Sequence, residues 1–239
     1  EEQDAVKRGD LDDKVGVSTE DILERVETER RRRIIKTLQQ KNFLKIGRVE
    51  FAPGVAFVAN DPFLKRYIAG ASVGYHWTEI FEIEASLSFA PDLGERDWKA
   101  LTTQLVEENH VSPDISKLQL FGSTVFSFSP IYGKVAFGQG TIINFDIFGL
   151  FGMGAAQTVD DLKALQAEND DRAEVTKVQI HPTTNFGGGF RIIFNESLAL
   201  RLEGRSLVYI ETVSSTTLEM KNNFIVRSSV AFFVPRIQR

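Results

Sequence analysis

The chain has 239 residues, of which 42% are hydrophobic and 26% charged, and its formal net charge is −5. This negative balance disfavours nucleic acid as a partner, because nucleic-acid binding depends on neutralising phosphates with basic residues. Cysteine is absent, which excludes disulfides, thiolate catalysis and cysteine–zinc sites. No apolar run reaches the roughly 18 residues that a transmembrane helix needs.

Residues 1–45 are highly charged and poor in aromatic residues, and their pattern is helical. Ser18 and Asp21 form a candidate capping box before a helix that continues to Leu38. Because no wide apolar face forms, we expect a solvated and partly ordered arm. Its alternative role is docking, through a basic patch that suits a partner protein or anionic lipid headgroups. The patch consists of Arg30, Arg31, Arg32 and Arg33.

Beyond the arm, apolar and polar residues alternate, strictly so over the nine residues of 81–89. A period of two predicts a β-strand with one apolar and one polar face. The pattern predicts an all-β fold with eight strands, at 47–60, 66–76, 80–90, 118–129, 141–157, 178–194, 198–212 and 222–233.

The connections between these strands alternate in length. Short ones at 76–79, 129–140 and 195–197 are interleaved with longer ones that include 91–117 and 158–177. Short turns at one end and long loops at the other are typical of an outer-membrane β-barrel. We predict 129–140 as a wide turn, because such barrels have even strand numbers, and a ten-stranded barrel is the alternative. Short helices are predicted in the long loops, at 97–109 and 160–168.

The two faces of the strands differ sharply in charge. The apolar face is rich in phenylalanine and carries no charged residue, and Leu118 is assigned to it. The polar face carries five bases and five acids. An arginine that faces lipid at mid-bilayer costs about 2–4 kcal/mol, so five would erase the stability of a typical domain. The sequence therefore predicts a lumen charge network of Arg48, Glu50, Glu82, Glu84, Asp146, Arg191, Arg201, Glu203, Arg205 and Arg227.

The predicted fold is an eight-stranded antiparallel transmembrane β-barrel over 46–234, with a periplasmic arm at 1–45 and a short tail at 235–239. Tyr75, Trp77 and Phe232 are predicted membrane-interface anchors. The rival fold, a soluble barrel of the lipocalin kind, would bury its apolar face and expose its charges. A charged face opposite a phenylalanine-rich face argues against it.

Candidate catalytic and metal-binding residues are few. The three histidines, His76, His110 and His181, lie on separate segments without zinc-ligand spacing. His76 is expected at headgroup level beside Trp77. A barrel enzyme acting on lipid A would need a base beside a nucleophile or carboxylate at the rim, and the sequence shows none. We therefore expect no catalytic residue, no cofactor and no metal.

Several segments carry a family resemblance, among them Lys-Asn-Phe-Leu-Lys-Ile-Gly-Arg-Val-Glu-Phe-Ala-Pro at 41–53 and His-Pro-Thr-Thr-Asn-Phe-Gly-Gly-Gly at 181–189. Further matches lie at 60–63, 84–87, 91–95 and 129–134. Together they resemble small outer-membrane β-barrel proteins of myxobacteria and related δ-proteobacteria, over about residues 11–234. The resemblance implies the bacterial outer membrane, and some members of that family are envelope components of gliding-motility machinery with periplasmic and lipoprotein partners.

The last strand, with Phe224, Val226, Val230 and Phe232, resembles an outer-membrane assembly signal, although a tail follows its final aromatic residue. We expect both termini in the periplasm. The expected function is a non-enzymatic structural or interaction subunit of an envelope complex. Its expected partners are outer-membrane lipids, lipopolysaccharide, and periplasmic or outer-membrane proteins that contact the arm and loops. A small-solute channel and a lipid A-modifying enzyme are the alternatives. Balanced lumen charges favour a salt-bridged plug over a pore.

Overall fold

The computed structural model describes residue 24 and residues 43–109, 115–137, 141–160, 178–213 and 217–234. The chain divides into two units, Glu1–Asn42 and Phe43–Arg239, and the elements below belong to the second. The arm up to residue 42 with its arginine patch, His110, the helix predicted after residue 160 and the tail at 235–239 lie outside the described residues, Glu24 excepted. None of the helices in the described residues has the length and apolarity needed to cross a membrane.

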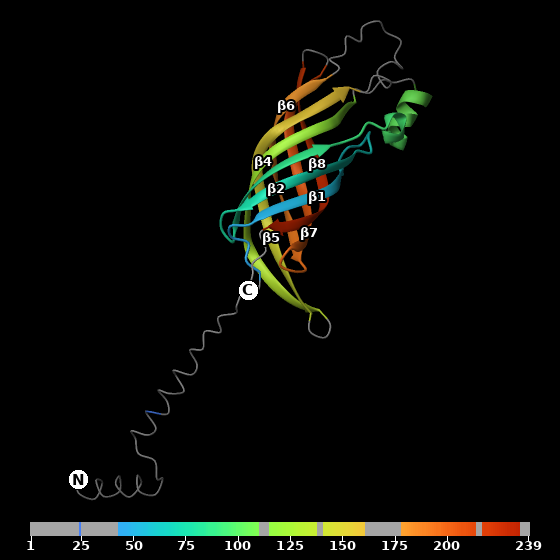
Figure 1. Ribbon diagram of the computed structural model, residues 1–239. Helices are drawn as coiled ribbons and strands as arrows, with labels where there is room; N and C mark the ends of the chain where they lie inside the picture. Colours follow the sequence, from blue (N-terminus) through green and yellow to red (C-terminus); the bar gives the residue numbers. More distant parts are fainter. Residues whose placement is uncertain are drawn as a thin grey trace, which may run out of the picture. The chain divides into compact units, whose positions relative to one another are not determined.

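Eight antiparallel strands close into a barrel in which each strand pairs with its neighbours in the chain and the last pairs with the first (Figure 1). This confirms the predicted eight-stranded fold. The strands are β1 (Val49–Val58), β2 (Tyr67–His76), β3 (Phe81–Phe89), β4 (Ser116–Phe137), β5 (Thr141–Asp160), β6 (Gln179–Ile193), β7 (Leu198–Val213) and β8 (Thr217–Val234).

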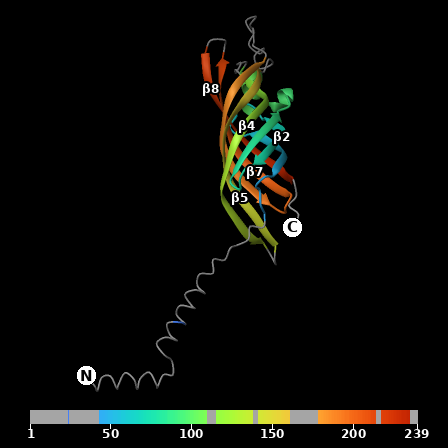
Figure 2. The same ribbon diagram turned by 60° about the vertical axis from the view of Figure 1, so that its left-hand side comes forward.

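The β4–β5 connection differs from its prediction. The expected wide turn at 129–140 is mostly strand, because β4 continues to Phe137 and pairs with β5 down to Thr141. A register shift between Phe128 and Ile131 absorbs the residues that interrupt the alternating pattern, as a β-bulge does. The ten-stranded alternative is wrong. The hairpin instead runs past the ends of the neighbouring strands (Figures 1 and 2).

Side chains alternate between the outside and the inside of the barrel as the period of two requires. Val55, Leu87 and Phe151 on the outer face are 65%, 61% and 62% exposed, and large apolar side chains are exposed on every strand. So extensive an apolar surface is not found on monomeric proteins in water. Leu118 is an exception to the predicted faces, since it is only 2% exposed. A register shift between Leu118 and Leu120 turns it inward.

The interior has apolar clusters at both ends and charges between them. The cluster at the end with the short turns consists of Phe43, Ala52, Ile193, Ala199, Ala231 and Phe233. The cluster toward the long loops includes Ile68, Phe121, Leu207 and Ile225. On β7 and β8 the charged residues, Arg201, Glu203, Arg205 and Arg227, lie between members of these two clusters, so the lumen is layered along this part of the wall.

The loops after β1 and β3 pack on each other at the long-loop end. Leu64, Trp98, Val106 and Ile115 form a small core, and Arg66 Nη1 lies 2.7 Å from Asp97 Oδ2 in a buried ion pair. The helix predicted at 97–109 is present in shorter pieces, as a 3₁₀ turn at Gly94–Asp97, α3 at Ala100–Thr103 and a π-helical turn, η2, at Gln104–Glu108.

The neighbouring strand lies so close to Gly187 that a larger residue there should destabilise the barrel. A Cβ atom there would lie 2.1 Å from the Gly204 carbonyl oxygen, whereas one at Gly149 would meet nothing nearer than 3.8 Å. We expect Gly187→Ala to cost about 1–3 kcal/mol of stability, as overpacking does, and Gly149→Ala to have little effect. The unfolding temperature on heat-modifiability gels measures both. Equal unfolding temperatures for the two variants would contradict this prediction and show that the backbone near Gly187 can shift to accept a methyl group.

Candidate functional site

All ten residues of the predicted charge network lie inside the barrel, and none is more than 6% exposed. They come from six different strands and the residue before β1, and the alternation of each strand turns them inward. Glu50 is on β1, Glu82 and Glu84 on β3, Asp146 on β5, Arg191 on β6, Arg201, Glu203 and Arg205 on β7, and Arg227 on β8. Charges far apart in sequence therefore converge on one lumen.

Arg191 is the centre of the network toward the short-turn end. Its Nη2 atom lies 2.8 Å from Glu50 Oε2 and 3.0 Å from Glu82 Oε2, and its Nη1 atom lies 3.4 Å from Asp146 Oδ2. The guanidinium also lies 5.5 Å from the centroid of the Phe148 ring. One arginine on β6 thus holds carboxylates from β1, β3 and β5, which spans the lumen.

Glu84 and Glu203 each bind two arginines in the next layer. Arg205 Nη2 lies 3.0 Å from Glu84 Oε1 and 3.1 Å from Glu203 Oε1. Arg201 Nη2 lies 2.9 Å from Glu203 Oε2, and Arg201 Nη1 contacts Glu84 Oε2. Arg205 also donates to the Ser123 hydroxyl at 3.0 Å. Sharing of this kind compensates charges that burial alone would make very costly.

Two of the ten residues lie apart from this centre. Arg227 Nη1 is 3.9 Å from Glu203 Oε1, and Arg227 Nη2 donates to the Ala52 carbonyl at 2.9 Å. Arg48 donates to the Phe233 carbonyl at 3.2 Å and lies 5.1 Å from the centroid of the Phe43 ring. Arg48 therefore lies at the short-turn end of the barrel, where its guanidinium contacts carbonyl oxygens and aromatic rings.

The structure adds residues that the sequence analysis missed. His76, expected at headgroup level, is 1% exposed and its Nε2 atom lies 2.9 Å from Glu50 Oε2. The alternation of β2 places His76 on the same inward face as Ile68 and Ser72. The period of two could therefore have predicted that His76 points into the lumen. Lys45 Nζ lies 2.9 Å from Asp146 Oδ2. Lys45 precedes the first strand, and no periodicity marked it.

Glu50, His76 and Glu82 bring ligand atoms within 4.8 Å of one another, which is a geometry that can hold a metal ion. Here the Arg191 guanidinium already lies against both carboxylates. A divalent cation at this point would meet a fixed positive charge. The residues therefore fit an ion-pair network better than a metal centre.

A second polar cluster lies toward the long loops. His181 Nε2 is 3.0 Å from Thr158 Oγ1 and 3.7 Å from Glu211 Oε1, and Thr158 donates to Glu211 at 3.0 Å. A catalytic triad needs the hydroxyl and the carboxylate on opposite nitrogens of the imidazole ring. Because both groups approach the same nitrogen, this cluster lacks the arrangement that activates a nucleophile.

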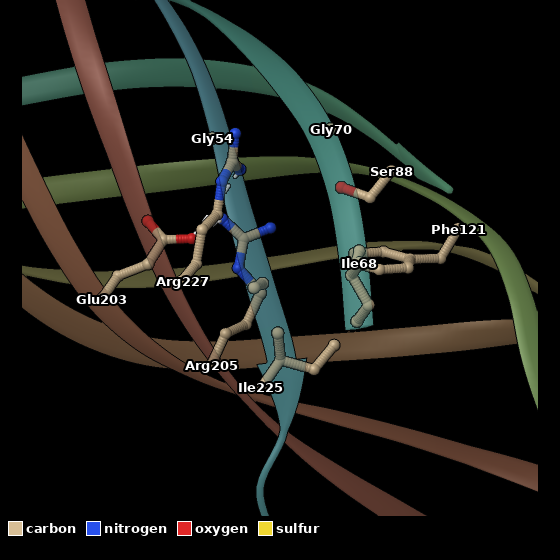
Figure 3. A pocket seen from close by; sticks show the side chains of 10 residues that line it. Gly54, Ile68, Gly70, Ser88, Phe121, Glu203, Arg205, Ile225 and Arg227 are labelled. Atoms are coloured by element: carbon tan, nitrogen blue, oxygen red, sulfur yellow. Dashed lines mark hydrogen bonds and ion pairs between the residues drawn. The ribbon is translucent and has the colours of Figure 1, made fainter. Parts of the chain in front are cut away.

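A cavity of about 10 Å³ lies beside the second layer of charges. Figure 3 shows Glu203, Arg205 and Arg227 on one side of it, with Ile68, Ser88 and Phe121 on the other. This volume holds about one water molecule. Gly54 and Gly70 also line it.

The predicted interface anchors are exposed near the short-turn end. Tyr75, Trp77 and Phe232 are 50%, 67% and 43% exposed. Phe81 stacks on Phe128 with ring centroids 5.1 Å apart, and this aromatic pair on the outer face was not singled out from the sequence.

An ion pair between β4 and the loop after β3 holds that loop. Lys117 Nζ lies 3.0 Å from Asp92 Oδ1, and Gly94 N–H donates to the same oxygen at 2.9 Å. Burial raises the pKa of Asp92, but these two donors outweigh that effect, so the pKa lies below its ordinary value.

Three solved structures have a similar architecture. The N-terminal β-barrel domain of Pseudomonas aeruginosa OprF is 14% identical with a TM-score of 0.46, covering 79% of this chain and 98% of that one. Neisserial surface protein A is 10% identical (TM-score 0.42; 78% and 95% covered), and Ail of Yersinia pestis is 8% identical (TM-score 0.38; 79% and 98% covered). No family model and no curated protein matches the chain. Identities this low describe architecture and not activity.

The shared carboxylates make Arg205 a sensitive position. Arg205→Leu leaves Glu84 and Glu203 buried with one arginine fewer, and we expect a loss of about 3–5 kcal/mol, as for other broken buried pairs. Arg96→Leu, in the exposed turn after β3, is the matched control. The unfolding temperature on heat-modifiability gels reports both.

A double variant tests whether the network acts as a unit. Arg205→Leu combined with Glu84→Gln should cost less than the sum of the single changes, because each removes a charge that the other leaves unpaired. Strict additivity, or an Arg205→Leu barrel as heat-resistant as the parent, would contradict the network.

Proposed function

We propose that the protein is a bacterial outer-membrane β-barrel that acts as a structural or interaction subunit of an envelope complex. The closed wall supports the membrane location, because a closed sheet leaves no unpaired backbone edge in hydrocarbon. The exposed apolar side chains on every strand support it too. Because its charges lie inside and its apolar groups outside, the outer surface of the barrel suits contact with lipid and not with water.

The observation that carries the proposal is the network of buried ion pairs that crosses the lumen. Side chains from β1, β3, β5, β6 and β7 meet through Arg191 and Arg201. An eight-stranded interior is just wide enough for side chains to fill. A ring of mutually paired acids and bases across that width favours a plugged lumen, which leaves the barrel wall and its ends as the proposed functional surfaces.

The two alternative functions find less support. A small-solute channel needs a lumen that stays open, whereas these charges bind one another. A lipid A-modifying enzyme needs an activated nucleophile, and the His181 cluster presents hydroxyl and carboxylate to one ring nitrogen.

We expect partner proteins to bind the parts of the chain that extend beyond the barrel wall. The β4–β5 hairpin extends past the strands beside it (Figure 1), and the packed loops after β1 and β3 form a second surface at the opposite end. Val49 at the start of β1 pairs with Val234 at the end of β8, so the first and last strands meet at the same end as the hairpin, and this is the end that we place in the periplasm. Lipopolysaccharide and envelope proteins are the proposed partners. The myxobacterial family and gliding motility belong to the proposal through the sequence resemblance alone.

Conductance separates the plugged subunit from the channel. We expect the folded barrel to insert into planar bilayers without producing current steps above the leak of the bare membrane. A general porin in the same detergent serves as the insertion control. Discrete steps from protein that gels show to be folded would overturn the sealed lumen and favour the channel.

The membrane location has its own test. Refolding should succeed in detergent or lipid and fail in plain buffer, because the outer face has no apolar partner in water. A monomer that stays folded and soluble without any amphiphile would contradict the proposal at its base.

A further inference from the structure

The segment Phe43–Gly47, just before β1, turns into the mouth of the barrel at the short-turn end. Its side chains alternate, with Phe43 and Lys45 at 3% and 2% exposure and Leu44 and Ile46 at 41% and 54%. Gly47 has a φ of 71°, which allows the sharp turn from this segment into the barrel wall. The segment therefore directs every second side chain into the lumen without being a strand of the barrel.

Phe43 fills the mouth. Its ring meets that of Phe233 edge to face, with centroids 4.9 Å apart, and it belongs to the apolar cluster that contains Ile193, Ala199 and Ala231. Ala199 is 0% exposed. The Phe43 ring thus packs in the same buried cluster as Ala199, and we expect its removal to open this cluster to the mouth of the lumen.

Lys45 ties the segment to the charge network. Its ammonium lies 2.9 Å from Asp146 Oδ2, an oxygen that also lies 3.4 Å from Arg191 Nη1. Arg191 supplies a second cation to Asp146, so the carboxylate keeps a partner when Lys45 leaves. This makes the lysine contact separable from the rest of the network.

The backbone of the segment is held by a side chain rather than by a strand ladder. The amides of Lys45 and Ile46 both donate to Glu79 Oε1 at 2.9 Å, and Gly47 N–H donates to the His76 carbonyl at 2.8 Å. Strand β1, which follows, is instead bonded along its length to β2 and β8. Backbone hydrogen bonds to the barrel wall are fewer along this segment than along β1, so we expect the segment to open locally while the barrel stays folded.

The segment directly follows the separate unit Glu1–Asn42. We propose that Phe43–Ile46 is a releasable stopper for the short-turn mouth of the lumen, with the Lys45–Asp146 pair as its catch. The stopper goes beyond the sealed-subunit function, because Arg191 and Arg201 still close the lumen behind it when it is withdrawn.

Chemical accessibility of Ala199 tests the stopper. The chain has no cysteine, so Ala199→Cys is a unique reporter behind the Phe43 ring. In folded barrels, we expect Phe43→Ala with Lys45→Met to raise the rate of maleimide labelling about tenfold or more, since the mouth opens. The matched control, Leu44→Ala with Ile46→Ala, changes only the exposed side chains and should leave the rate unchanged. Equal rates in all three backgrounds, or the same rise in the control, would overturn the proposal.

Single-molecule pulling from the N-terminus tests whether the segment is released before the strands and needs no destabilised variant. The parent chain should show a weak rupture near a released length of about 46 residues, roughly 160 Å, before the first strands leave the membrane. Lys45→Met should lower or remove this event and leave the later ones in place. A parent trace without any event before strand extraction would refute the stopper. Planar-bilayer silence together with that trace would still leave the sealed-subunit function standing.

Discussion

Ionised side chains that cannot face lipid are the constraint on which the rest of this barrel depends. Five arginines and five acids sit on the inward positions of a wall whose outward positions are apolar. Each charge is tolerable only when others meet it, because removal from water is costly for an unpaired ion. Closure of the sheet brings these groups together from strands that are distant in sequence. The wall and the network therefore require each other.

The same constraint explains why the lumen is layered rather than uniform. Arg191 and Arg201 lie among the carboxylates, whereas an apolar cluster that includes Phe233 lies toward the short-turn end and one that includes Ile225 lies toward the long loops. Rings also lie beside the guanidinium groups, with Arg201 only 4.6 Å from the centroid of the Phe148 ring. Such contacts add cation–π attraction in a medium of low polarity. A functional role in contact rather than in transport is consistent with an interior filled in this way.

Much of the fold could be predicted from the period of two, because a strand side chain has only two directions to point. The alternation of 81–89 alone assigns Glu82 and Glu84 to one face and Phe81 to the other. Prediction failed where the backbone departs from that period. Register shifts turned Leu118 inward and extended β4 through residues assigned to a turn. The pairing partners within the lumen could not be predicted either, since they depend on how far each strand slides past the next. Lys45 lay outside any strand pattern.

The double occupancy of Glu84 and Glu203 restricts how this sequence can diverge. Each carboxylate contacts Arg201 and Arg205 at once, so exchange of either acid removes a partner from both cations. We therefore expect single substitutions at these four positions to be costly. Related chains should either keep the set intact or replace it wholesale, and intermediates between the two solutions should be rare among natural variants.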